Sequence, residues 1–175
     1  MRRLLNNELG RMSPDQFRNS EKSPFVIVLD NVRSHHNVGS IFRTSDAFRI
    51  KKICLCGITA KPPHRDIQKT ALGATETVDW SYYVTTEEAV DLLKAEGYMI
   101  YAVEQAEGSE TLQNVKTEPG QKYALVFGHE VNGVDQNILN RCDSCIEIPQ
   151  FGTKHSFNIA VSVGIVLWEL NRSKK

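Results

Sequence analysis

Short runs of apolar residues alternate along the chain with segments whose apolar positions recur about every 3.6 residues. The first uninterrupted run, from Phe25 to Leu29, is typical of a strand buried on both faces. Further strands are predicted over residues 52–56, 98–103, 123–127 and 145–148. Helices are predicted from residue 13 onward and over residues 37–48, 66–72, 85–95, 135–140 and 156–171. Strands that alternate with helices predict an α/β fold with a mostly parallel sheet and helices on both faces.

Polar residues mark several of the predicted helix starts. Ser13 precedes Pro14, which is a cap followed by a proline in the first turn. Thr85 and Glu88 have the spacing of a capping box. Ser156 is predicted to cap the last helix, whose N-terminal amides favour an anion.

Apolar side chains lie all around the predicted last helix, among them Phe157, Val161, Ile165 and Trp168. A helix that is apolar on every side is buried, and a small domain has difficulty covering all sides of a terminal helix. The pattern therefore predicts self-association through this helix. The alternative is a helix packed in the centre of the domain.

The length of 175 residues and the hydrophobic content of 41% predict a single domain over residues 1–175, with residues 1–22 as an N-terminal helical extension. No apolar run approaches the roughly 20 residues that a membrane span needs. The N-terminus lacks the apolar core of a secretory signal. A cytoplasmic protein without a membrane partner is expected.

The formal net charge is zero, but the charges are unevenly distributed along the chain. Residues 1–73 contain 13 lysines and arginines and 6 acidic residues, a net charge of +7. Residues 74–175 contain 8 and 15, a net charge of −7. This asymmetry points to a basic surface that binds a polyanion, unless the charges interleave in space and cancel.

The four cysteines occur in two pairs, Cys54 with Cys56 and Cys142 with Cys145. Neither pair has a second pair nearby or histidines at the spacing of a zinc site, so no metal site is predicted. Cys54 and Cys56 lie in an apolar run, where a free cysteine behaves as a small hydrophobic residue. Reduced structural thiols are expected, and the role of Cys142 and Cys145 stays open.

The first candidate for chemistry is the segment after residue 29, because ligands of open α/β sheets bind beyond the carboxyl ends of strands. It contains neither a G-x-G-x-x-G turn nor a P-loop, which argues against the usual dinucleotide and ATP sites. Val38 and Ile41 share the apolar face of the following helix, whereas Arg43 points outward near the predicted crevice. Its guanidinium suits a phosphate or carboxylate, and an ion pair with Asp46 is the alternative.

Two histidines and two further loops complete the candidates. His35 and His36 lack a third metal ligand, so we interpret them as loop residues that contact phosphate. Gly128 and Gly133 lie five residues apart after a predicted strand and allow tight turns and close approach to a ligand. The third segment, residues 148–158, is a polar loop that leads into the last helix.

These segments contain three ordered motifs, Asn37-x-Gly39-x-Ile41-x-Arg43, Phe127-Gly128-x-Glu130-x-x-Gly133 and Ile148-Pro149-x-x-Gly152 followed by Ser156-x-Asn158. Together they resemble the SpoU/TrmH family of SPOUT RNA 2′-O-ribose methyltransferases over about residues 25–171. His129 stands where the family often has a carboxamide, and Ser40 where a small apolar residue is common. Phe157 replaces the usual leucine, so the subfamily stays open.

The resemblance implies a SPOUT fold with a C-terminal trefoil knot, S-adenosyl-L-methionine as cofactor, no metal and a homodimer. It implies RNA as partner, with tRNA favoured over rRNA because the chain resembles a bare catalytic core without a separate RNA-binding domain. The implied cofactor-binding residues are Val103, Phe127, Gly128, Ile148, Gly152, Ser156 and Phe157. The implied catalytic residues are Arg43, Asn37, Glu130, Ser156 and Asn158, and the RNA-binding residues are Arg33, His36 and Arg43.

In this interpretation Arg43 binds the phosphate beside the reacting ribose and stabilises a developing alkoxide, because a guanidinium stays protonated in proteins. Arginine as the base stays open, as does whether Arg43 serves its own cofactor or that of a partner. Two alternatives are a non-catalytic RNA-binding module that retains the fold and a small-molecule methyltransferase on another α/β scaffold. The three motifs argue against the second.

Overall fold

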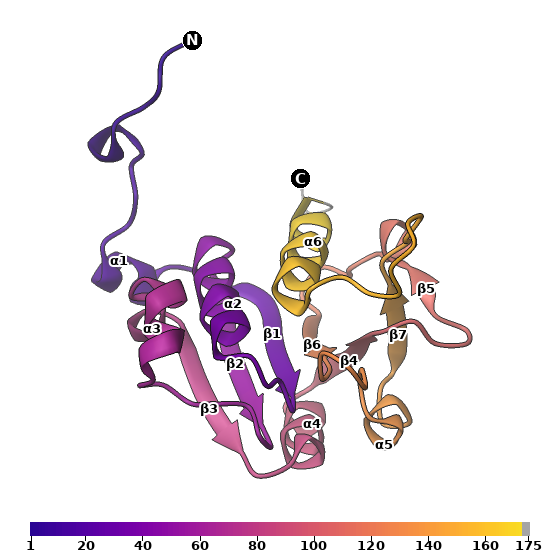
Figure 1. Cartoon of the computed structure of the whole chain (residues 1–175). Helices are drawn as coiled ribbons and strands as arrows, with labels where there is room; N and C mark the ends of the chain where they lie inside the picture. Colours follow the sequence, from indigo (N-terminus) through magenta and orange to yellow (C-terminus); the bar gives the residue numbers. More distant parts are fainter. Residues whose placement is uncertain (173–175) are drawn as a thin grey trace.

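The structure, a computed structural model, describes residues 1–172, which form a seven-stranded sheet (Figure 1). The strands are β1 Ser23–Asp30, β2 Ile50–Cys56, β3 Asp79–Tyr83, β4 Tyr98–Val103, β5 Glu110–Thr111, β6 Lys122–Phe127 and β7 Ser144–Glu147. Their order across the sheet is β3-β2-β1-β6-β4-β7-β5, and every neighbouring pair is parallel. The predicted α/β class and parallel sheet are confirmed.

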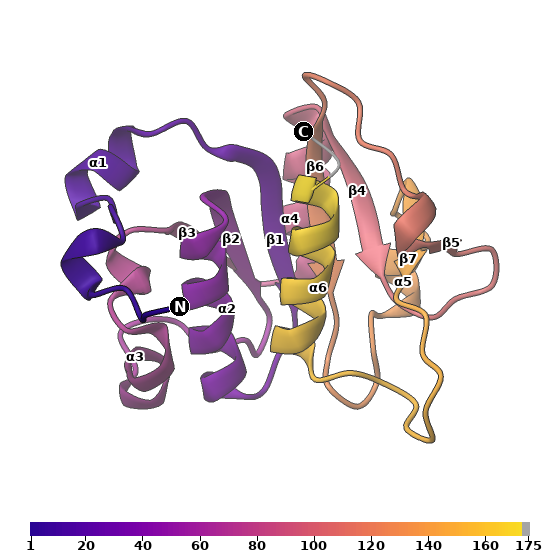
Figure 2. The ribbon, with the colours of Figure 1, turned by 90° about the horizontal axis from the view of Figure 1, so that it is seen from above.

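Helices cover both faces of this sheet. The α-helices are α1 Pro14–Asn19, α2 His35–Ala47, α3 Arg65–Ala71, α4 Thr86–Ala95, α5 Gln136–Leu139 and α6 Ile159–Arg172, and the 3-10 helices are η1 Asn6–Glu8, η2 Ala74–Glu76 and η3 Leu112–Asn114. Helices α2, α3 and α6 pack on one face, and α4 and α5 pack on the other (Figure 2). The sheet therefore lies between two separate apolar layers.

Strand β1 shows why a continuous apolar run marks a central strand. Phe25, Ile27 and Leu29 belong to the apolar cluster that contains α2 and α6. Val26 and Val28 point to the other face and join the cluster that contains α4. Because successive side chains of a strand alternate between its faces, a strand covered on both sides must be apolar at every position.

The sequence did not predict the strands β3 and β5, which both pack at the edges of the sheet. Every residue of β3 is exposed or half-buried, so no apolar run identifies it. Strand β5 has only two residues. Edge strands bury fewer side chains, and local sequence therefore says less about them.

Two predicted helix starts differ in detail from the structure. Helix α2 begins at His35, two residues earlier than predicted, because Ser34 caps it and accepts a hydrogen bond from the Asn37 amide at 3.3 Å. At α4, Thr85 accepts the predicted bond from the Glu88 amide. The Glu88 carboxylate, however, accepts a bond from the Val84 amide and not from the Thr85 amide. Only one of the two hydrogen bonds of the predicted capping box is therefore formed.

The strand order reverses direction next to β1, and this reversal places a ligand site. The chain moves outward from β1 through β2 to β3, and α4 then leads back across the sheet to β4. Strand β6 fills the position between β1 and β4. In open parallel sheets, ligands bind beyond the carboxyl ends of the strands at such a reversal.

Gly39 sets how closely α2 approaches α3. A Cβ atom at this position would lie 2.1 Å from the Thr70 hydroxyl and 2.3 Å from the Ile67 carbonyl oxygen. We predict that Gly39→Ala lowers the free energy of unfolding by about 1–3 kcal/mol, because one helix must move away from the other. Equilibrium urea unfolding measures this change. Ser40→Ala is the control on the same helix, and an equal loss of stability in both variants would contradict the prediction.

Candidate active site

A pocket of about 480 Å³ opens at the carboxyl ends of β4, β6 and β7, beside the start of α6. Its walls come from three loops, which follow β4 and β6 and connect β7 with α6. The pocket therefore lies next to the reversal in strand order, where the topology of the sheet predicts a ligand site.

Two glycines shape the loop after β6. His129 and Gly133 exchange backbone hydrogen bonds of 3.0 and 2.9 Å, which close the loop on itself. A Cβ atom at Gly128 would lie 2.2 Å from the Gly133 carbonyl carbon, and Gly133 has a φ of 68°, which favours glycine. Both glycines predicted to allow a tight turn are thus required by the backbone of this wall.

Glu104 and Gln105, directly after β4, connect the three loops and were not predicted. The Glu104 carboxylate accepts hydrogen bonds from the Val134 amide at 3.0 Å and from the Gln105 amide at 2.8 Å. The Gln105 side chain donates to the His155 carbonyl at 2.6 Å. The only sequence signal was their place after an apolar strand, where polar residues of a site often lie.

Glu130 brings the first and second motifs together. Its carboxylate accepts hydrogen bonds from the backbone amides of Arg33 and Ser34, both at 3.0 Å, and from the Asn37 side chain at 3.1 Å. Burial of the carboxyl group raises its pKa, but these hydrogen bonds outweigh burial and hold the pKa of Glu130 below its ordinary value. The group is therefore a carboxylate at neutral pH.

Asn158 adds the third motif to the same network. Its side-chain amide donates a hydrogen bond to the side-chain oxygen (Oδ1) of Asn37 at 3.1 Å. The side-chain oxygen of Asn158 accepts a bond from the Ala160 backbone amide at 2.9 Å. Asn37, Glu130 and Asn158, which were predicted separately from three motifs, thus form one hydrogen-bonded chain at the edge of the pocket.

The predicted start of the last helix was wrong. Helix α6 begins at Ile159, not at 156. Asn158 is the residue before it, and its backbone carbonyl accepts a hydrogen bond from the Ser162 amide at 2.9 Å. Ser156 is exposed, lies in the preceding loop and lines the pocket. The side-chain oxygen of Asn158 caps the helix, which is the role predicted for the hydroxyl of Ser156.

Arg43 does not lie near the strand-end crevice, contrary to the prediction. Helix α2 runs back along β1 (Figure 1). Arg43 follows Asn37 by six residues in this helix, so it lies about 9 Å farther along the helix axis at 1.5 Å per residue. Arg43 is exposed, as predicted, and within residues 1–172 its side chain forms no hydrogen bond or ion pair. Asp46 instead accepts a hydrogen bond from the Thr77 hydroxyl at 2.5 Å.

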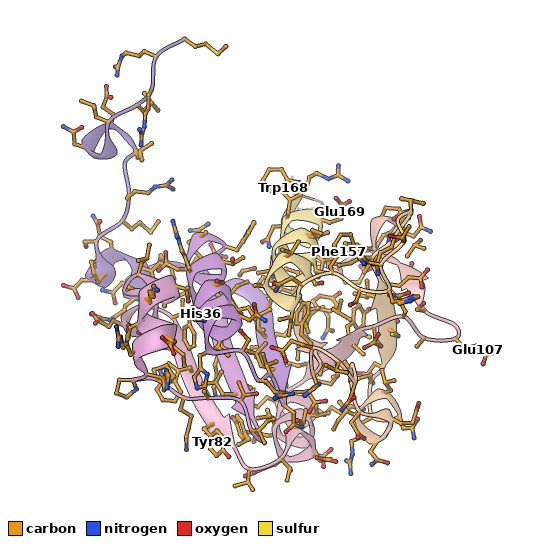
Figure 3. The ribbon with its side chains drawn as sticks, in the orientation of Figure 1. His36, Tyr82, Glu107, Phe157, Trp168 and Glu169 are labelled. Carbon is orange, nitrogen blue, oxygen red and sulfur yellow. The ribbon has the colours of Figure 1, made fainter. Side chains whose placement is uncertain are left out.

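The structure gathers most of the remaining predicted residues. The pocket is lined by Val103, Phe127, Gly128, Ile148, Ser156 and Phe157. Gly152 lies in the β7–α6 loop but does not line the pocket. Arg33 and His36 are exposed near the start of α2. His36 lies away from Phe157, which is beside α6 (Figure 3).

None of the four cysteines lines the pocket. Cys54 and Cys56 are buried, and burial raises the pKa of the Cys54 thiol to about 11. Cys142 is half-buried, and burial raises its pKa to about 12. Within residues 1–172, no three histidine, cysteine or acidic side chains are arranged to hold a metal ion. No helix in that range has both the length and the apolar character needed to cross a bilayer.

The class of protein follows from the position of this pocket. It is a parallel α/β protein whose site is formed by the loops after β4, β6 and β7, with no glycine-rich turn after β1. A family model described as the SpoU rRNA Methylase family matches residues 24–168, so the chain belongs to this family.

Relatives with assigned names are similar over most of the chain. The 23S rRNA (guanosine-2′-O-)-methyltransferase RlmB of Neisseria meningitidis serogroup B is 29% identical over 160 residues, which is 91% of this chain and 63% of that protein. The crystal structure of an AdoMet-bound rRNA methyltransferase from Sinorhizobium meliloti has a TM-score of 0.81 and 27% identity, and covers 93% of this chain and 61% of that one. This chain therefore spans less than two thirds of both relatives.

The match with a third relative covers a larger share of that relative's chain. The crystal structure of the A. aeolicus TrmH/SpoU tRNA modifying enzyme has a TM-score of 0.79 and 25% identity. The match covers 90% of this chain and 78% of that one. The named relatives thus include proteins that act on rRNA and on tRNA.

The Glu130 network predicts a pH-dependent stability. We expect Glu130→Gln to lower the free energy of unfolding at pH 7 by about 2 kcal/mol, because a neutral amide cannot accept all these hydrogen bonds. The folded-state pKa lies below the ordinary value of 4.5, so the carboxylate stabilises the protein above that pH. This contribution disappears as the pH falls through the folded-state pKa.

Urea unfolding of both proteins between pH 3.5 and 7 measures this effect, and the stability difference between wild type and variant should narrow toward the acidic end. Glu107→Gln is the matched control, because Glu107 is exposed at the far end of a loop (Figure 3). A stability difference that is constant over the whole pH range would contradict the prediction.

Proposed function

We propose that this protein is an S-adenosyl-L-methionine-dependent RNA 2′-O-ribose methyltransferase. The observation that supports this proposal best is the hydrogen-bonded chain of Asn37, Glu130 and Asn158, which joins all three family motifs beside one pocket. The names of the relatives, which include a guanosine-2′-O-methyltransferase and an AdoMet-bound rRNA methyltransferase, support it as well.

The pocket is suited to this cofactor in size and chemistry. A volume of about 480 Å³ falls within the range of small-molecule sites. Val103, Phe127 and Ile148 provide apolar walls for an adenine ring, and the carboxylates of Glu104 and Glu130 favour a cationic ligand. When bound, S-adenosyl-L-methionine supplies an electrophilic methyl group. Backbone groups at Gly128 and Phe157, with the Ser156 hydroxyl, would hold its polar ends; no metal takes part.

The roles of the polar residues follow from their chemistry. Arg43 would bind the phosphate beside the reacting ribose and stabilise negative charge on the 2′-oxygen. Because a guanidinium stays protonated, a phosphate oxygen or water would accept the proton. Asn37 and Asn158 would orient the ribose, and Glu130 would hold Asn37 and the start of α2 in place.

In this proposal, two copies of the chain form a homodimer through α6. An apolar groove of about 540 Å³ runs along α6 and includes Phe48, Val161 and Trp168. Val161 is 50% and Trp168 65% exposed, although soluble monomers rarely leave such a continuous patch uncovered. A second copy of the chain would bury these residues and satisfy the pattern of a helix that is apolar on all sides.

The groove also explains how Arg43 would reach a pocket. Ile148 lines both the groove and the cofactor pocket, and Phe48 lines the groove five residues after Arg43. In a two-fold dimer, each copy presents the same surface to the other. Covering the groove would therefore bring the Arg43 of one copy toward the pocket of its partner.

The C-terminal trefoil knot, the substrate and the location belong to the same proposal. The hydrogen bonds of Glu104 to Val134 and of Gln105 to His155 join the loops through which a knotted chain would pass. We favour tRNA as substrate over rRNA, with rRNA as the alternative, and a cytoplasmic location.

Arg43→Ala tests the catalytic role of this residue. We expect the rate of methyl transfer to fall by at least about 100-fold, because charge stabilisation at the reacting oxygen is lost. Affinity for S-adenosyl-L-methionine, measured by calorimetry, should stay unchanged. The assay transfers a labelled methyl group into total tRNA and rRNA from cells that lack the protein. Normal turnover of Arg43→Ala would refute the assignment, and wild-type protein that binds no cofactor would favour a non-catalytic RNA-binding module.

A mixed dimer tests whether Arg43 acts across the interface. Val103→Trp fills the pocket without altering the groove, so homodimers of Val103→Trp and of Arg43→Ala should both be inactive. We expect a heterodimer of the two variants to recover methyl transfer, because one intact pocket then faces an intact Arg43. Two affinity tags isolate the heterodimer for the assay. An inactive heterodimer would show that Arg43 serves the pocket of its own chain.

A further inference from the structure

The carboxyl edge of β1, β2 and β3 carries a strip of basic and ring-bearing side chains next to the cofactor pocket. We define this edge strip as the exposed residues Arg33, Lys61, His64, Arg65 and Tyr82 together with the half-buried His35. None of these residues belongs to the three motifs, and none of them lines the pocket. Figure 3 shows Tyr82 at the end of β3.

The loop that contributes Lys61 and His64 is held firmly against its neighbours. The Asn31 side chain accepts a hydrogen bond from the Ile58 amide at 3.1 Å. Thr59 accepts a bond from the Val32 amide at 2.9 Å and donates one to the Leu29 carbonyl at 3.1 Å. Its base is therefore fixed to the loop after β1, and the exposed side chains project from a rigid support.

The rings of the strip are arranged in two contacts. The His35 and His64 rings are stacked, with centroids 4.0 Å apart and an interplanar angle of 27°. The Lys61 ammonium lies 4.0 Å from the centroid of the Tyr82 ring, whose hydroxyl donates to the Gly57 carbonyl at 3.0 Å. These contacts give the strip preformed ring surfaces and a fixed cation.

His64 presents a defined surface to solvent. Its Nδ1 atom accepts a hydrogen bond from the Asp66 amide at 3.2 Å, so the neutral ring carries its proton on Nε2. His35 covers one face of the ring, and the residue remains exposed. A planar group can therefore stack on the free face, and an acceptor can bind the Nε2 proton.

The strip continues directly into the candidate active site. Glu130, which lines the pocket, holds the amides of Arg33 and Ser34, and His35 is the next residue. A chain of phosphates that leaves the pocket along this edge would meet Arg33, Lys61 and Arg65.

We infer that the edge strip binds unpaired RNA next to the methylated nucleotide, with a base stacked on His64 and phosphates paired with Lys61 and Arg65. This inference rests on the proposed function for its choice of RNA. Exposed aromatic rings among cations are the features with which proteins hold single-stranded RNA. A duplex keeps its bases stacked on one another and cannot use the free face of His64.

Fluorescence anisotropy with a labelled oligouridine of about 12 nucleotides, free or annealed to oligoadenosine, tests the inference. His64→Asn removes the ring but keeps a side-chain acceptor for the Asp66 amide. We expect it to weaken binding of the single strand by roughly ten-fold or more and to leave duplex binding unchanged. His64→Trp restores a ring and should recover the affinity. Lys61→Gln should weaken both and reduce the salt dependence.

Lys51→Ala is the control, because Lys51 is exposed at the other end of β2. Unchanged single-strand binding by His64→Asn, or an equal loss for single strand and duplex, would overturn the inference. Calorimetry with S-adenosyl-L-methionine on the same proteins keeps the two proposals apart. A wild type that binds oligouridine through His64 but no cofactor would refute only the proposed function, whereas cofactor binding without a His64 effect would refute only the strip.

Discussion

The carboxylate of Glu130 is the interaction on which the geometry of the site depends. A partly buried charge is tolerated only when hydrogen bonds replace its water, and here the donors are two backbone amides and Asn37. These donors come from the loop after β1 and from the first turn of α2, whereas Glu130 follows β6. The bonds therefore fix where α2 begins, and through Asn37 and Asn158 they also fix where α6 begins.

Sequence patterns predicted the parts of the fold in which local composition reflects burial. Strands β1, β2, β4, β6 and β7 have apolar runs because helices cover both faces of the sheet, whereas the edge strands β3 and β5 have none. In the site, the motif residues Asn37, Glu130 and Asn158 were predicted, but their mutual bonds were not. These bonds join residues 93 and 121 positions apart, and local periodicity carries no information over such distances. Glu104 was missed because its role depends on a bond to the Val134 amide, 30 positions away in the sequence.

The two oppositely charged halves of the chain are neighbours in the sheet. Strand β6 of the acidic half lies directly beside β1 of the basic half. The acidic groups at this boundary, Glu104 and Glu130, face the pocket and accept backbone hydrogen bonds. The basic groups, among them Lys61 and Arg65, are exposed along the outer edge. A neutral protein can in this way present a cation site and a polyanion surface side by side.

The direction of α2 places Asn37 and Arg43, which belong to the same motif, at different distances from the pocket. A helix that follows a parallel strand starts at the ligand edge and runs away from it, at 1.5 Å per residue. Only its first turn can serve the pocket of the same chain, and Asn37 lies there. Arg43 lies nearly two turns farther on, five residues before Phe48 of the apolar groove. In the proposed dimer, each copy would therefore supply its Arg43 to the pocket of its partner. Burial of the apolar groove would align the two copies for this exchange.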